Sequence, residues 1–124
     1  KEKKLNVCGH LIYGLPNETQ DMMLSTLKQT IDLNVDSIKF HPLYVVKHTL
    51  LTSIYKKGNF TPISEALYID TIVKSIKILP SNIIVQRITA GINSSTLLSP
   101  NWCLNKHSQM FNIRKALLKE GFYY

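Results

Sequence analysis

The chain has 124 residues, of which 44% are hydrophobic and 19% charged, a composition that is typical of a globular domain and excludes a disordered chain. No apolar run reaches the length of a membrane span, and no long apolar segment follows the basic start, so we expect neither a transmembrane helix nor a signal peptide. The net charge of +7 has two interpretations, a solvated lysine-rich surface or a surface that attracts a polyanion.

The two cysteines, Cys8 and Cys103, lie far apart in the sequence. Neither belongs to a CxxC motif or to a Cys/His cluster with metal-ligand spacing, so we expect no metal ligand in this chain. A disulfide between them is one interpretation, and two buried thiols in a reducing cytosol is the interpretation that we favour. We therefore expect a cytoplasmic protein.

The first predicted elements are a strand and a helix. Residues 6–14 form a nearly continuous apolar run of strand length, as in a parallel strand that is covered on both faces. Residues 18–34 carry apolar side chains on one helical face, and either Asn17 or Thr19 is suited to cap this helix. Asn34 is expected to end it.

The middle of the chain predicts one strand and two helices. The strand covers 35–43, and a short helix covers 47–58. The next helix is expected to have Thr61 and Pro62 as its cap and first turn, and to stop at Pro80.

A third strand over 82–91 and a last helix over about 101–120 complete the order β-α-β-α-α-β-α. The face of that last helix is expected to comprise Cys103, His107, Met110, Ile113 and Leu117. Strands that alternate with helices imply an α/β fold with a parallel sheet and right-handed crossovers. Because three strands leave exposed edges, we expect part of a barrel or sheet whose earlier strands are missing.

The stretch "YGLPNET" joins the first strand to the first helix. Gly14 has no Cβ and lets a ligand approach the backbone, and Pro16 fixes the turn. The free N–H groups of the helix that begins near Thr19 point back toward such a ligand. A plain tight turn explains the same residues equally well.

Four blocks in order resemble one enzyme family: "HLIYGLPNET", "IKFHPLYVVKHT", "VQRITAG" and "PNWCLNK". They are similar to radical S-adenosylmethionine (SAM) enzymes of the YhcC/YtqA-like family, which is related to the catalytic subunit of Elongator. The resemblance runs from about Gly9 to Gly121. His10 departs from the broader family motif, which begins with glycine at that point, and Asn17 and His48 also stand where glycine is common.

The resemblance implies the C-terminal half of a partial, TIM-like parallel β/α barrel that occupies residues 1–124. In this family SAM binds beside a 4Fe–4S cluster, and a 5′-deoxyadenosyl radical is generated that abstracts hydrogen from a substrate. The three cluster cysteines belong to the N-terminal half, which is absent here, so we expect the chain alone to be inactive. The leading substrate by analogy is tRNA, at the wobble uridine.

The resemblance also implies which residues meet SAM. Ile12 and Gly14 match the I-x-G pattern that packs against the adenine. Phe40, His41 and Leu43 lie at the end of the second strand, where the matching strand of the family meets the adenosyl group. His41 is suited to hydrogen-bond SAM or substrate, or to act as an acid or base, and the alternative is that it anchors the loop.

Gln86 and Arg87 belong to a VQR stretch that is similar to one in Elongator-like enzymes. If Val85 and Arg87 lie on the same face of their strand, Arg87 points into the barrel mouth. A buried guanidinium needs an anion, and we expect the carboxylate of SAM, a substrate phosphate or the carboxylate of Asp36. A structural ion pair is the alternative.

The remaining candidates have structural interpretations that we favour. Trp102 is expected to cap the core, Asn105 to satisfy the loop backbone and His107 to be a buried core histidine. Lysines and an arginine are candidates for a phosphate-facing surface if the substrate is tRNA, although a solvated face is the favoured interpretation: Lys39, Lys47, Lys106 and Arg114.

Two rival functions remain open. One is a non-catalytic basic α/β module that binds nucleic acid or a partner protein, with affinity for RNA that falls steeply with salt. The other is an unrelated barrel fragment whose glycine turn binds phosphate. The favoured hypothesis remains the C-terminal part of a radical SAM enzyme, whose partners are SAM, tRNA and the missing N-terminal half.

Overall fold

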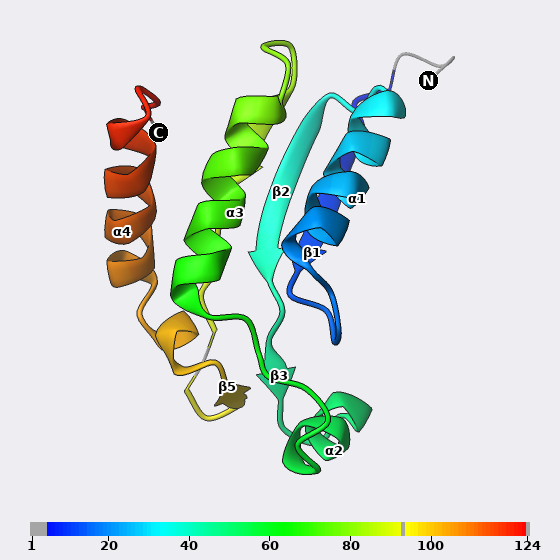
Figure 1. The fold of residues 1–124 in the computed structure, drawn as a ribbon, viewed down its shortest axis with the longest axis vertical. Helices are drawn as coiled ribbons and strands as arrows, with labels where there is room; N and C mark the ends of the chain where they lie inside the picture. The colour runs from blue at the N-terminus through cyan, green and yellow to red at the C-terminus, as the bar shows by residue number, and fades with distance from the viewer. Residues whose placement is uncertain (1–4, 93, 124) are drawn as a thin grey trace.

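The computed structural model describes residues 5–92 and 94–123. Three strands, β1 (Cys8–Tyr13), β2 (Ser37–Pro42) and β4 (Ile84–Arg87), form one sheet in the order β1-β2-β4 (Figure 1). Both pairs of neighbours run parallel, which confirms the predicted α/β fold with a parallel sheet.

Three long helices cover one side of this sheet. They are α1 (Gln20–Asp32), α3 (Glu65–Ile78) and α4 (Lys106–Lys119), and α3 contacts both of the others (Figure 1). None of the helices among the described residues covers the other side of the sheet. Nor is any helix in that part of the chain long and apolar enough to cross a membrane.

A second, small sheet lies beyond the end of β2. It pairs β3 (Val45–Val46) with β5 (Leu97–Ser99) in antiparallel orientation, next to the short helix α2 (Leu50–Lys56) (Figure 1). The predicted order of elements lacks both strands. They are too short to show the alternation of apolar and polar residues by which a strand is found in a sequence.

The helix α1 is bounded by the residues that its sequence indicates. The Thr19 hydroxyl accepts a hydrogen bond from Met22 N at 3.2 Å, which makes Thr19 the N-cap. Asn17 and Asn34 have φ angles of 64° and 59°, a left-handed conformation that asparagine adopts more readily than most residues. The left-handed Asn34 breaks the helical geometry and confirms the predicted stop.

The helix α3 begins later than predicted, so the assignment of Thr61 and Pro62 to its cap and first turn is wrong. Ser64 is the N-cap, and its hydroxyl accepts from Leu67 N at 3.1 Å. The preceding residue, Ile63, is held outside the helix because its carbonyl accepts from Trp102 Nε1 at 2.9 Å. A contact between distant parts of the chain thus overrides the local signal.

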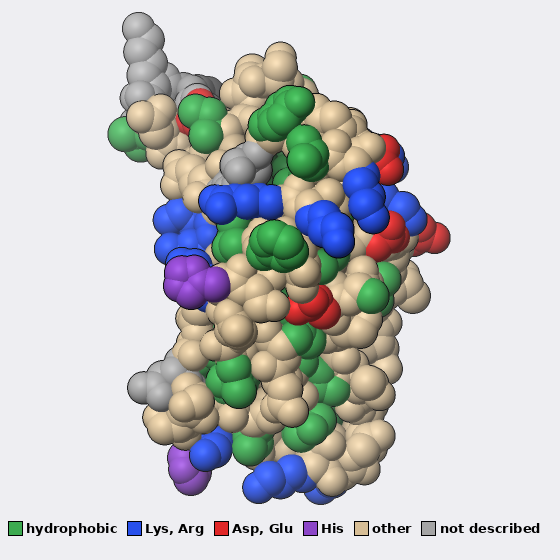
Figure 2. Space-filling view, turned by 90° about the vertical axis from the view of Figure 1, so that its left-hand side faces the viewer, with side chains coloured by type: hydrophobic (Ala, Val, Ile, Leu, Met, Phe, Trp, Pro, Cys, Tyr) green, Lys and Arg blue, Asp and Glu red, His purple; other side chains and the backbone are tan. Residues whose placement is uncertain are grey.

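The last helix is divided at Asn105 into η1 (Asn101–Leu104) and α4. The Asn105 side chain accepts from Ser108 N at 2.9 Å and starts α4 afresh. Cys103, Ile113 and Leu117 of the predicted face are buried and Met110 packs against the core, whereas Gln109 takes the buried place expected of His107. His107 is exposed, which contradicts the predicted core histidine. The outward side of α4 mixes apolar side chains with Lys and Arg (Figure 2).

The core lies between the parallel sheet and its helices. The strands contribute alternate residues to it, and the helices contribute one face each. Its central members are Leu11, Tyr13, Met23, Leu27, Ile38, Phe40, Tyr68, Ile72, Ile113 and Leu117. The other residues of the strands therefore face away from the helices.

Candidate functional site

The side of the sheet away from the helices carries most of the predicted ligand-binding residues. Because Leu11 and Tyr13 of β1 are buried under the helices, His10 and Ile12 point the other way. Ile12 is 48% exposed, a large exposure for isoleucine. We call this surface the open face. It comprises Cys8, His10, Ile12, Ser37, Lys39, His41, Ile84, Gln86 and Arg87.

Ile12 lies beside His41 on the open face, because the parallel register of β1 and β2 pairs these two residues. Paired residues on neighbouring strands share a face and are separated by about 4.8 Å. Both residues lie near the carboxyl ends of their strands, where ligands bind in parallel α/β proteins. The fold thus brings together two of the residues that the sequence singled out.

The imidazole of His41 is held in one orientation. Its Nδ1 lies 2.5 Å from the carbonyl oxygen of Pro42, and its ring meets that of Tyr44 edge-on at 4.5 Å. Burial lowers the pKa of His41 below the ordinary 6.5, the hydrogen bond to the Pro42 carbonyl partly opposes this shift, and the charges of Arg87 and His10 add to it. Because a carbonyl only accepts, Nδ1 carries the proton, and Nε2 is an unprotonated acceptor at neutral pH.

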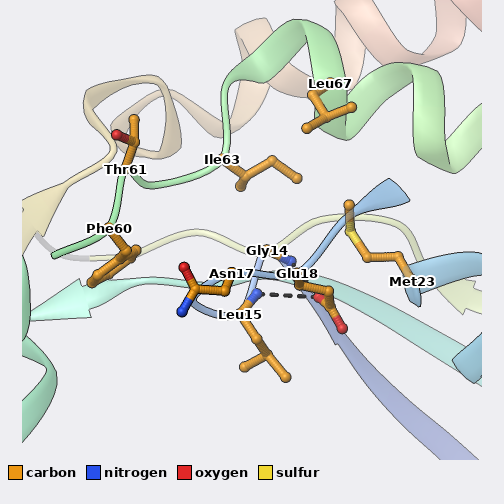
Figure 3. Close-up of a pocket in the computed structure, with 9 residues that line it drawn as sticks. All are labelled: Gly14, Leu15, Asn17, Glu18, Met23, Phe60, Thr61, Ile63 and Leu67. Carbon is orange, nitrogen blue, oxygen red and sulfur yellow. Dashed lines mark hydrogen bonds between the residues drawn. The ribbon is translucent and has the colours of Figure 1, made fainter. Parts of the chain in front are cut away.

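Gly14 ends β1 for a reason that involves packing rather than ligand approach. Its φ of +98° favours glycine, and a Cβ built on it would lie 2.8 Å from Cγ2 of Ile63 (Figure 3). The N–H groups of Gly14 and Leu15 both donate to Oε1 of Glu18, at 3.1 and 3.2 Å. These two donors are therefore satisfied within the chain.

A cavity of about 220 Å³ lies beside the same turn, between Gly14 and the segment that precedes α3 (Figure 3). Phe60, Ile63 and Leu67 form much of its wall. Sites for drug-sized ligands enclose about 300–1,000 Å³. This cavity is too small for a nucleoside with an amino-acid chain.

Phe40 and Leu43 lie apart from the open face. Phe40 is fully buried and its ring centroid is 5.4 Å from that of Tyr13, so its side chain belongs to the core under the helices. We therefore omit Phe40 from the candidate site. Leu43 follows β2 and is half-buried, and its N–H donates to the carbonyl of Tyr13 at 2.9 Å. Leu43 thus continues the β1–β2 ladder at the mouth of the site.

Gln86 and Arg87 both belong to the open face, but for a different reason from the predicted one. The pairing shifts between Ile38–Val85 and Lys39–Arg87, a β-bulge in which Gln86 is the extra residue. Val85 therefore packs against the core while Arg87 is exposed, so the condition that the two share a face is not met. Gln86 Nε2 donates to Ser37 Oγ at 2.7 Å.

Comparison with known families settles the family of the chain. Residues 35–119 match the radical SAM C-terminal domain. The chain belongs to this family. It is 36% identical over 121 residues to protein YhcC of Escherichia coli K12, a match that covers 98% of this chain and 39% of YhcC. This radical SAM C-terminal domain thus spans about two fifths of the length of that relative.

Two further relatives extend the comparison. A tRNA uridine(34) acetyltransferase of Methanocaldococcus jannaschii is 27% identical over 101 residues, or 79% of this chain and 19% of that protein. The structure of the archaeal Methanocaldococcus infernus Elp3 with an N-terminal deletion superposes with a TM-score of 0.81 at 26% identity. The superposition covers 94% of this chain and 28% of that one. The chain therefore shares its fold with this part of Elp3.

The family implies SAM and an iron–sulfur cluster. The residues of this chain do not suit the cluster, but some of them suit the adenine of SAM. The chain has two cysteines, fewer than the three that the cluster requires, and Cys103 is buried. Within residues 5–92 and 94–123, no group of three His, Cys, Asp or Glu side chains is placed to hold a metal ion. The exposed Ile12 beside the acceptor Nε2 of His41 does fit an adenine, which has an apolar face and an amino group that donates.

The structure adds His10 to the candidate site and places beside it Lys39, already a candidate for a phosphate-facing surface. The register pairs them with each other, one step along the strands from the Ile12–His41 pair. Each lies two residues before a predicted site residue in its strand. The alternation of side chains along a strand was thus a signal in the sequence from which their shared face could have been found.

Proposed function

We propose that the chain is the C-terminal half of a radical SAM barrel, and that the end of its open face at Ile12 and His41 lines the SAM site. The observation that carries the proposal is the paired placement of Ile12 and His41 at the carboxyl ends of parallel strands. The family match and the Elp3 fold support it. The rest of the barrel, with the cluster cysteines, would come from a longer polypeptide.

The residues of the proposed site make different contacts with SAM. Ile12 packs against the face of the adenine, and Nε2 of His41 accepts a hydrogen bond from its amino group. Leu43 lies at the mouth of the site, and Gly14 positions the end of β1 through its packing against Ile63. SAM beside a reduced 4Fe–4S cluster supplies a carbon radical that abstracts hydrogen, and this chain contributes position and solvent exclusion.

The proposed substrate is tRNA, at its wobble uridine. The name of the Methanocaldococcus jannaschii relative, tRNA uridine(34) acetyltransferase, supports this choice. The net charge of +7 suits a polyanionic substrate, since a positive field favours association with phosphates. Nucleoside mass spectrometry of tRNA from cells that lack the gene tests it, and an unchanged uridine 34 would refute this choice of substrate.

The SAM site is tested in the longer polypeptide, purified without oxygen and with its cluster reconstituted. Ile12→Ser is expected to raise the Kd for SAM about tenfold or more, because a buried isoleucine contributes about 1.5–3 kcal/mol. Equilibrium dialysis measures this Kd. Ile84→Ser is the control, since Ile84 is 66% exposed at the opposite end of the open face. Equal effects of the two substitutions, or none from Ile12→Ser, would contradict the proposed site.

A further inference from the structure

Three basic side chains form one row across the open face. The register pairs His10 of β1 with Lys39 of β2, and Lys39 with Arg87 of β4. Because neighbouring strands are about 4.8 Å apart, the row spans about 10 Å. Three long or ring-shaped polar side chains over that distance are able to contact a single bound group.

The bulge in β4 is what completes this row. In a regular strand without the bulge, Arg87 would share the buried side of Val85, because residues two apart in a strand share a face. The shift in pairing instead exposes Arg87 opposite Lys39, and the Gln86 amide is held by its hydrogen bond to Ser37 Oγ. Bulges commonly redirect a side chain in this way next to functional sites.

The basic side chains of the row have no acidic partner among the described residues. The charges of Arg87 and His10 both lower the pKa of His41, which lies two residues from Lys39 on the same face of β2. Within the described part of the chain, neither Lys39 nor Arg87 forms a salt bridge. The acids nearest along the strands have other contacts: Asp36 accepts from Val7 N at 2.7 Å, and Glu18 accepts from the turn at Gly14.

We propose that the row His10–Lys39–Arg87 binds a phosphate group of the substrate. Lys39 and Arg87 supply two positive charges, which match a dianionic phosphate better than a single carboxylate, and His10 adds a hydrogen-bond donor. The row lies one step along the strands from the proposed adenine contacts. The inference rests on the proposed function only for this position beside SAM, because phosphate binding itself needs no SAM.

The test uses the 124-residue chain with inorganic pyrophosphate as the probe, at constant ionic strength. Binding is followed by the NMR signals of the His10 and His41 imidazoles. Lys39→Gln with Arg87→Gln is expected to weaken binding at least tenfold. The control, Lys28→Gln with Lys115→Gln, removes two positive charges from exposed helical positions and should change the affinity less than twofold.

The outcomes separate this inference from the proposed function. Equal losses in the two double variants would mean that pyrophosphate senses only the overall charge, and would overturn the phosphate site. A rise of the His41 pKa in the Lys39/Arg87 variant is expected if that variant is folded, because the repulsion from Arg87 is gone. Selective pyrophosphate binding together with failure of the longer polypeptide to bind SAM would retain this inference and reject the proposed function.

A second arm identifies the source of the phosphate. An RNA hairpin that displaces pyrophosphate, and whose affinity falls in the Lys39/Arg87 variant but not in the control, assigns the row to the RNA backbone. Displacement by a nucleoside monophosphate without displacement by the hairpin assigns it to a small phosphorylated ligand. Either result supports the phosphate site, whereas no selective displacement and no selective pyrophosphate binding would reject it.

Discussion

The backbone of Gly14 lies against the side chain of Ile63, with room for no further atom between them. A Cβ on residue 14 would come within 2.8 Å of Ile63 Cγ2 and 2.9 Å of Ile63 Cβ. Ile63 is in turn held by the hydrogen bond from Trp102 to its carbonyl. The end of β1 is thus positioned by a segment about fifty residues away in sequence.

Gly14→Ala is expected to destabilise the chain more than Gly58→Ala. Both glycines have positive φ angles, +98° and +73°, and the left-handed conformation costs alanine about 1–2 kcal/mol. Only Gly14 has a neighbour within 4 Å of the added Cβ, so overpacking against Ile63 adds ~1–3 kcal/mol. Urea unfolding measures the two free energies, and equal losses would show that Ile63 moves aside freely.

The hydrogen bond between Tyr13 and Ser75 ties β1 to α3 and offers a second test. Their oxygens are 2.8 Å apart and buried, and burial raises the pKa of Tyr13 to about 12. Tyr13→Phe is expected to lower the free energy of unfolding by about 1 kcal/mol. A double-mutant cycle with Ser75→Ala isolates the pair. The control is Tyr55→Phe, since the Tyr55 hydroxyl has no hydrogen-bond partner among the described residues and should be nearly neutral.

The lowered pKa of His41 predicts a stability that depends on pH. The folded chain binds this proton less readily than the unfolded chain, whose histidine titrates near 6.5. As the pH falls below 6.5 the unfolded state takes up the proton first, so the free energy of unfolding decreases until the folded pKa is reached. His41→Gln should therefore lose less stability than the wild type between pH 7.5 and about 5, in urea unfolding at constant salt. If the free energy of unfolding changes equally with pH in the two chains, the imidazole of His41 is exposed to solvent rather than partly buried.

The parts of the fold that were predicted correctly are those that local chemistry determines. Thr19 caps α1 because its hydroxyl reaches a free N–H, and Asn34 ends the helix because it accepts left-handed angles. The parallel sheet followed from the alternation of apolar runs with helical segments. These signals lie within a few residues of the structure that they specify.

The errors arise where distant residues decide the conformation. The start of α3 depends on Ile63 being held by Trp102, and the placement of Arg87 depends on a bulge that only the pairing of strands reveals. The prediction that Phe40 and His41 both meet the ligand is an error of another kind, which local information could have prevented. Adjacent residues of a strand point to opposite faces. The alternation along the strand could be read from the sequence, and it indicated that only one of Phe40 and His41 belongs to the ligand site.

The two cysteines are expected to react very differently with a thiol reagent. Cys103 is fully buried in η1, and burial, with a smaller effect from the charge of Glu65, raises its pKa to about 12. A thiol with that pKa has almost no thiolate at pH 8, and the thiolate is the species that reacts. Cys8 lies half-exposed on the open face and is accessible to reagent.

Iodoacetamide at pH 8 should therefore modify Cys8 in the folded chain and leave Cys103 unmodified, as read by mass spectrometry of the peptides. Both should react in urea, which controls for intrinsic reactivity. Cys8→Ser gives a chain in which modification of Cys103 reports only the opening of the η1 segment from the core. Rapid modification of Cys103 in that variant under native conditions would mean that η1 detaches, and with it Trp102, which holds Ile63 against Gly14.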